Sequence, residues 1–121
     1  MDVLIITPWN PKMGDVIGHE LDLREDTTVC RTRGKGLQVI REITERYDLI
    51  ICQLAPIGIE GASGWLGKLA RLPADVRSKM VVFCLLSLGF DAIDSFGFRR
   101  YVLWSMITPV QMFVDECLEP A

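Results

Sequence analysis

The sequence predicts an α/β fold: a three-layer, doubly wound sheet of five parallel strands in the order 2-1-3-4-5, in a single domain over residues 1–121. Five short apolar runs alternate with segments of helical periodicity, which is the pattern of βα units around a parallel sheet. Most of these runs are continuously apolar rather than alternating, as expected of strands buried on both faces. With 121 residues, of which 50% are hydrophobic, the chain has the material for one core.

Each apolar run is short enough for a strand and is bounded by polar residues or turn signals. The predicted strands are Val3–Ile6, Thr27–Cys30, Leu49–Cys52, Met80–Leu86 and Tyr101–Trp104. The second is the most polar and is therefore expected near an edge of the sheet. The first and third are expected at its centre, and the fourth contains no polar residue.

Between the strands, apolar residues recur at helical spacing and define one buried face for each helix. The three sets are Met13, Val16, Ile17 and Leu21; Leu37, Ile40, Ile43 and Tyr47; and Trp65, Leu66, Leu69 and Leu72, which Pro73 ends. The last helix is predicted to begin with Thr108 as N-cap and Pro109 at the first helical position. Its expected apolar face consists of Val110, Phe113, Val114 and Cys117.

Charge and cysteine usage argue against several classes of protein. The 13 basic and 16 acidic residues are intermixed and give a net charge of −3, so nothing favours nucleic acid or a membrane as partner. The 4 cysteines lie far apart and there is 1 histidine, so we expect no metal site and no disulfide framework. The sequence shows neither a signal peptide nor a membrane span. We expect a cytoplasmic protein with reduced thiols and no cofactor.

Several short motifs keep the order and spacing of a known family. The segment YDLIICQLAP at 47–56 contains Gln53, and Gly61 follows it; Gly97-Phe98-Arg99-Arg100-Tyr101 precedes the last predicted strand. In these features the chain resembles response-regulator receiver domains over nearly its whole length, and the resemblance implies the flavodoxin-like strand order. It also implies a signalling domain in which an aspartate accepts phosphate and neighbouring acids hold Mg²⁺.

The positions that would bind phosphate and magnesium are replaced. At the end of the first strand, Thr7 and Pro8 stand where the family has an acid pair. Gln53 stands at the phosphoacceptor position, or Cys52 if the alignment slips by one residue, because Pro56 comes one residue early. Neither an amide nor a thiol rebuilds an acidic magnesium pocket.

Two further family positions have changed. The switch hydroxyl after the fourth strand corresponds to Leu85, and the lysine near the end of the fifth corresponds to Trp104. The resemblance therefore implies a degenerate pseudo-receiver: not an enzyme, but a phosphorylation-independent regulatory module that works through protein–protein interaction.

The segment between Ser87 and Tyr101 is several residues shorter than in a typical receiver, so we expect a shortened fourth helix. The flanks of the fifth strand and the last helix would then be less covered, and exposed aromatic side chains commonly anchor partners. The expected interaction face, for a protein partner or a second copy in a homodimer, is Phe98, Tyr101, Trp104 and Phe113. Phe98 and Tyr101 are the expected outward anchors.

A second hypothesis is a small-molecule-binding or enzymatic flavodoxin-like domain. Such domains use the loops at the carboxyl ends of the strands, where this chain places Pro8, Trp9, Ile57 and Ile59. No carboxylate, histidine or lysine converges there in the sequence, which argues against catalysis.

Three other features have a functional and a structural interpretation. Cys52 and Cys84 could form a redox pair, although buried cysteines are usually inert. His19, one helical turn from Asp15, could act as a general base, and the basic segment 31–35 could hold an anion at a helix N-terminus. A buried thiol, a surface histidine and a solvated loop are the favoured interpretations.

Overall fold

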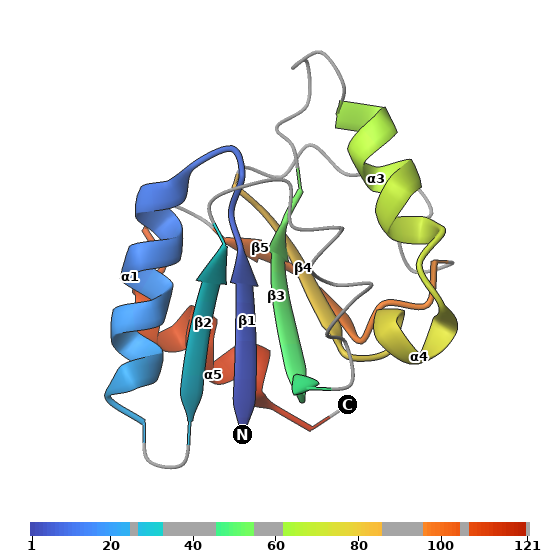
Figure 1. The fold of residues 1–121 in the computed structure, drawn as a ribbon. Helices are drawn as coiled ribbons and strands as arrows, with labels where there is room; N and C mark the ends of the chain where they lie inside the picture. The colour runs from blue at the N-terminus through green and yellow to red at the C-terminus, as the bar shows by residue number, and fades with distance from the viewer. Residues whose placement is uncertain (25–26, 33–45, 55–61, 86–95, 105–106, 121) are drawn as a thin grey trace.

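The computed structural model describes residues 1–24, 27–32, 46–54, 62–85, 96–104 and 107–120. They form a five-stranded parallel sheet in the order β2-β1-β3-β4-β5, with helices on both faces (Figure 1). The elements in chain order are β1 Asp2–Ile6, α1 Pro11–Asp22, β2 Thr28–Thr32, β3 Leu49–Gln53, α3 Ala62–Ala70, α4 Ala74–Arg77, β4 Met80–Leu85, β5 Arg100–Trp104 and α5 Val110–Leu118. The predicted fold class and strand order are confirmed.

Strand parity divides the core into two apolar layers, because successive side chains of a strand point to opposite faces. On one face, α3 and α4 cover a cluster made of Leu4, Ile6, Ile50, Cys52, Leu54, Trp65, Leu69, Leu72, Val76, Met80 and Val82. On the other, α1 and α5 cover Val3, Ile5, Ile17, Leu21, Leu49, Ile51, Val81, Phe83, Val102, Trp104, Phe113, Val114 and Cys117. Every residue of β1 after Asp2 and of β3 is buried, as predicted for the two central strands.

Each strand differs from its predicted range by one or two residues at an end, and at β2 and α5 a residue has a different role from the one predicted. Thr27 precedes β2 rather than beginning it, and its hydroxyl donates to Leu21 O at 2.6 Å and Arg24 O at 3.0 Å. It therefore gives Arg24 O a partner just after α1 and adds a second donor to Leu21 O, which also accepts the backbone N–H of Arg24 at 2.9 Å. At α5, Pro109 is the N-cap and Thr108 lies outside the helix, so the predicted cap is one residue early.

The helices confirm part of the prediction. Val16 was expected on the buried face of α1 but is 48% exposed, whereas Ile17 and Leu21 are buried. The four-residue α4 was not predicted, because one turn is too short to show a hydrophobic period. The helix expected around Leu37–Tyr47 lies mostly outside the described residues. So does the segment between Ser87 and Tyr101 in which the shortened fourth helix was expected.

Among the described residues, no helix combines the length and the apolar character needed to cross a lipid bilayer.

Candidate functional site at the carboxyl edge of the sheet

The carboxyl ends of β1, β3, β4 and β5 meet at one edge of the sheet, where open α/β sheets bind ligands. Thr7 follows β1, and Gln53 ends β3. Leu85 ends β4 and pairs in register with Trp104, the last residue of β5. The topology therefore brings to one edge the positions that the family resemblance marks as the phosphorylation site. The side chain of Leu85 lies outside the described part of the chain.

Gln53 is turned inward and holds the loop between β1 and α1. It is 1% exposed, and its Oε1 accepts a hydrogen bond from the backbone N–H of Asn10 at 3.1 Å. Its backbone carbonyl accepts the indole N–H of Trp65 at 3.0 Å and the thiol of Cys52 at 3.7 Å. The amide at the phosphoacceptor position thus has a structural partner and almost no access to solvent.

Thr7 is packed tightly against the first helix. It is 2% exposed, and a Cβ built on Gly14 would lie 2.4 Å from Thr7 Oγ1. Only a residue without a side chain allows α1 to approach the end of β1 this closely. Where the family has an acid pair, the structure thus has a buried hydroxyl against a glycine, followed by the partly buried Pro8.

An aromatic pair adjoins this edge. The rings of Trp9 and Trp65 meet edge to face, with centroids 6.3 Å apart and planes at 88°. Trp65 is buried, whereas Trp9 is partly buried and packs against the same apolar cluster. The indole nitrogen of Trp9 is buried and has no hydrogen-bond partner in the structure as described.

Trp104, at the position of the family's lysine, points away from this edge into the core. Its ring stacks on Phe113 with centroids 4.5 Å apart and planes at 11°, and meets the edge of Phe83. Its indole nitrogen donates to Thr108 O at 2.9 Å, which fixes the turn into α5. The side chain is therefore a core anchor, without a cationic group to reach toward a phosphate.

The described residues at this edge do not fit the magnesium ion that receiver chemistry requires. Mg²⁺ prefers carboxylate oxygens and water in a near-octahedral arrangement. Among the described residues, Thr7 and Pro8 supply no carboxylate, and Gln53 Oε1 already accepts the Asn10 N–H. Among the residues whose positions are described, no three His, Cys, Asp or Glu side chains gather as a metal site.

The cysteines at this edge lack the environment of a redox pair. In the register of β3 and β4, Cys52 lies opposite Val82, and Cys84 is two residues further along. Burial raises the pKa of both thiols above the ordinary value of 9.0. A reactive cysteine needs a lowered pKa, so the structure favours the interpretation as inert core residues.

The predicted interaction face is only partly at the surface. Trp104 and Phe113 are 9% and 1% exposed, so naming them as surface residues was wrong: the parity of β5 points Trp104 toward α5, where it meets Phe113. Phe98 and Tyr101 are partly buried and pack against the cluster beneath α3. Burial, followed by the charge of Cys84, raises the pKa of Tyr101, whose hydroxyl is buried without a described hydrogen-bond partner.

The exposed large apolar side chains lie elsewhere. Those of the described residues are Met1, Val16, Leu23, Leu103, Ile107 and Met112. Val16 and Leu23 line a groove of about 430 Å³ between α1 and α5, together with Asp15, His19 and other side chains. This groove could not be predicted from the sequence, because helical periodicity does not show whether α5 covers Val16 or leaves it exposed.

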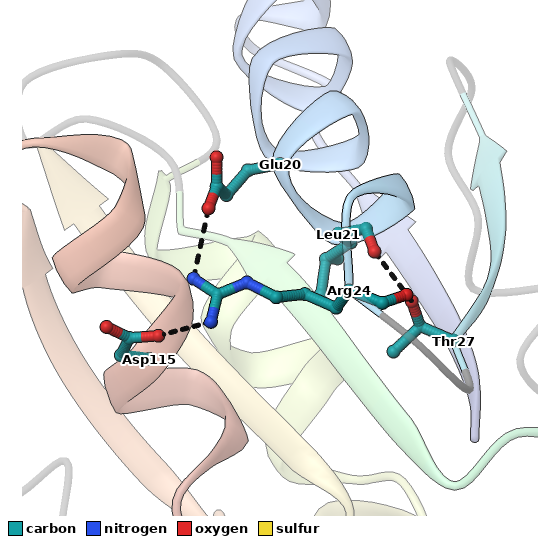
Figure 2. A network of polar contacts seen from close by, with 5 residues as sticks. All are labelled: Glu20, Leu21, Arg24, Thr27 and Asp115. Atoms are coloured by element: carbon teal, nitrogen blue, oxygen red, sulfur yellow. Dashed lines mark hydrogen bonds and ion pairs between the residues drawn. The ribbon is translucent and has the colours of Figure 1, made fainter.

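One arginine ties the two helices that form the groove. Arg24 Nη2 contacts Glu20 Oε1 at 3.0 Å, and Nη1 contacts Asp115 Oδ1 of α5 at 2.7 Å (Figure 2). Next to Arg24, the hydroxyl of Thr27 donates hydrogen bonds to the carbonyls of Leu21 and Arg24 at the end of α1 (Figure 2).

The His19 considered as a general base is exposed and lines the groove with Asp15, away from the buried Cys52. The side chains of the basic segment 31–35 lie outside the described residues.

Comparison with solved structures agrees with the receiver-like fold. The chain aligns over 98% of its length with 90% of the response regulator domain of Thermotoga maritima CheB, at a TM-score of 0.59 and 17% identity. A chain from the complex of the histidine kinase ThkA with the response regulator protein TrrA aligns over 98% of both chains, at 0.57 and 18%. The cpaE protein of Burkholderia thailandensis aligns over 96% of this chain and 93% of its own, at 0.62 and 11%.

No protein-family model matches the sequence, and a search of curated proteins finds no significant match. At these identities the structural likeness establishes the fold alone: the chain has a receiver-like fold.

Proposed function

We propose that this receiver-like domain is a regulatory module of a cytoplasmic signalling system, which works without phosphorylation and without enzymatic activity by binding a protein partner. The observation that carries the proposal is the hydrogen bond between Gln53 and Asn10. It gives the residue at the phosphoacceptor position a structural role in place of a chemical one.

Three features support the loss of phosphoryl transfer. The amide of Gln53 is a poor nucleophile, and its 1% exposure leaves a phosphodonor no approach. No carboxylate at Thr7 or Pro8 is available to hold a metal that would neutralise the transferred group. Trp104 supplies an apolar ring to the core where a cation would be needed.

The comparison with solved structures supports the partner-binding half of the proposal. One of the similar chains comes from a complex between a histidine kinase and a response regulator, so this fold is compatible with docking onto another protein. Since the fold by itself does not imply this role, the proposal needs the direct test that follows.

The test is the intact mass of the protein after incubation with acetyl phosphate and Mg²⁺. We expect no added phosphoryl group, with the CheB response regulator domain as a positive control. The variant Gln53→Asp should also stay unmodified, because the acid pair and the lysine are still missing. A phosphorylated wild-type protein would overturn the proposal, and a phosphorylated Gln53→Asp would show that the surrounding site is intact.

A further inference from the structure

We propose that the end of α5 is a strap, held closed by Arg99 and Arg100, which opens while the sheet stays folded. The strap consists of residues 116–120, which are the last turn of α5 and the two residues after it. Opening the strap uncovers the thiol of Cys117, which is fully buried in the closed state. The inference concerns a conformational change and does not depend on the proposed function.

The strap is held from outside its own helix, by two arginines at the start of β5. The helix α5 ends at the edge of the sheet where the strands begin, so its last carbonyl groups lie beside Arg99 and Arg100 (Figure 1). Arg99 Nη2 donates to Glu119 O at 2.7 Å. Arg100 Nη1 donates to Glu116 O and also to Glu119 O, the latter at 3.2 Å. Arg100 Nη2 donates to Pro120 O at 3.2 Å. Carbonyl groups at the end of a helix have no donor in a following turn, and here guanidinium groups donate to them.

The sequence of α5 provides no cation for this end of the helix. Its last turn contains Glu116 and no basic residue, and Glu119 is the C-cap. Both carboxylates lie at the negative end of the helix dipole, where cations stabilise a helix and anions do not. Arg100 Nη2 lies 4.0 Å from Glu119 Oε2, so it also reduces this repulsion. Closing the strap therefore depends on charges that another element supplies.

The closed state of the strap is held more weakly than the core of the sheet. The hydrogen bonds of both arginines to the strap are exposed to solvent, where salt screens them. Arg99 Nε is buried and has no hydrogen-bond partner in the part of the chain that the structure describes, which costs free energy. Three of the five strap residues are exposed, whereas Cys117 and Leu118 pack against the apolar cluster. A segment with few buried apolar contacts and exposed hydrogen bonds opens before the rest of a fold.

The alkylation rates of two buried thiols measure this opening. The protein reacts with iodoacetamide for increasing times, and peptide mass spectrometry gives the alkylated fraction of each cysteine, relative to its rate in denaturant. Cys52 is the internal reference, because it is fully buried in the central strand β3 and reacts only when the sheet unfolds. We expect Cys117 to react at least about tenfold faster than Cys52 in the wild-type protein. Raising the salt concentration should widen this difference, because salt screens the arginine contacts.

Substitution of the arginines tests the strap itself. Arg99→Gln combined with Arg100→Gln should raise the alkylation rate of Cys117 at least about tenfold and leave that of Cys52 within about twofold. Arg71→Gln, at an exposed arginine just after α3, is the matched control and should leave both rates within about twofold.

A faster reaction of Cys117 in the double variant cannot come from the lost charge alone. Burial, followed by the charge of Glu116, raises the pKa of Cys117 to about 12, and the charge of Arg100 acts in the opposite direction. Removing Arg100 by itself therefore leaves less thiolate and slows alkylation, so an increased rate reports opening.

The proposal is overturned if Cys117 and Cys52 react at the same rate in the wild-type protein, since Cys117 is then reached only by global unfolding. It is also overturned if the double variant accelerates both thiols equally or leaves Cys117 unchanged. An effect of Arg71→Gln on Cys117 as large as that of the double variant would likewise remove the special role of Arg99 and Arg100.

Discussion

The side-chain oxygen of Gln53 accepts the backbone N–H of Asn10 at 3.1 Å, across 43 residues of sequence. The bond joins the end of β3 to the residue that caps α1, and so closes the edge of the sheet at which the receiver fold has its phosphorylation site. Around it, Trp65 donates to the Gln53 carbonyl, so the same residue is held by both its backbone and its side chain. The arrangement stabilises the loop and engages the side-chain oxygen of Gln53.

Replacing Gln53 with alanine should lower the free energy of unfolding by about 1–3 kcal/mol, because the Asn10 N–H loses its partner in a partly buried setting. Urea denaturation followed by circular dichroism measures the change. Gln111→Ala, at an exposed position of α5, is the control and should stay within about 0.5 kcal/mol of wild type. Equal stability of the two variants would show that the hydrogen bond contributes nothing.

Gly14→Ala should destabilise the protein by about 1–3 kcal/mol, because the new methyl group would overlap Thr7 Oγ1. The matched control is Gly64→Ala in α3, where a Cβ meets nothing within 4 Å. That change should stabilise by about 0.4–1 kcal/mol, since alanine favours a helix over glycine. Combining Gly14→Ala with Thr7→Ala should recover part of the loss, and additive effects in this double-mutant cycle would contradict the contact.

Trp104→Ala should cost about 3–5 kcal/mol, because the ring stacks on Phe113 and its N–H is bonded to Thr108. Leu103→Ala, one residue earlier and 47% exposed, should cost less than about 1 kcal/mol. Urea denaturation gives both values, and the near-ultraviolet circular dichroism should change only for Trp104→Ala. A small effect at Trp104 would place its ring at the surface, as the sequence had suggested.

Of the four cysteines, only Cys30 is exposed, and the other three are buried. In the native protein, one thiol per chain should therefore react quickly with a colorimetric disulfide reagent, and all four should react in denaturant. Cys30→Ser should remove the fast reaction. A second fast thiol would point to an accessible carboxyl edge, and Cys84→Ser would identify it.

Alkaline pH should destabilise the fold through the buried thiols. Burial, followed by the charge of Glu116, raises the pKa of Cys117 from its ordinary value of 9.0 to about 12. In the unfolded chain the thiol loses its proton near pH 9, whereas in the folded chain it keeps it, so the unfolded state binds fewer protons between these values. Stability is therefore full below pH 9 and falls as pH rises toward 12, by about 1.4 kcal/mol per pH unit for this group. Cys117→Ala should fall less steeply in urea denaturation across this range.

Periodicity and composition were enough to predict a parallel sheet, and the family resemblance supplied the order of its strands. Continuous apolar runs such as Val3–Ile6 and Leu49–Cys52 can be buried on both faces only in the middle of such a sheet, and they are. The family positions Thr7, Gln53 and Trp104 could also be placed at its carboxyl edge, because each lies at the end of a predicted strand. The carboxyl ends of parallel strands lie at the same edge of a sheet. What these residues contact there could not be predicted, since each contact depends on a loop or helix distant in sequence.

The sequence by itself determined the fold, the replacement of the acids at the family's phosphorylation site and the absence of a lysine at Trp104. These are properties of residue type and period, which act locally. Only the tertiary structure decided that Gln53 bonds Asn10, that Gly14 abuts Thr7, and that Val16 faces a groove rather than the core. Helical periodicity marks a face as apolar but does not say which neighbour covers it. The docking angle of α1 and α5, fixed by the core between them and by Arg24, left the side of α1 that carries Val16 and Leu23 open.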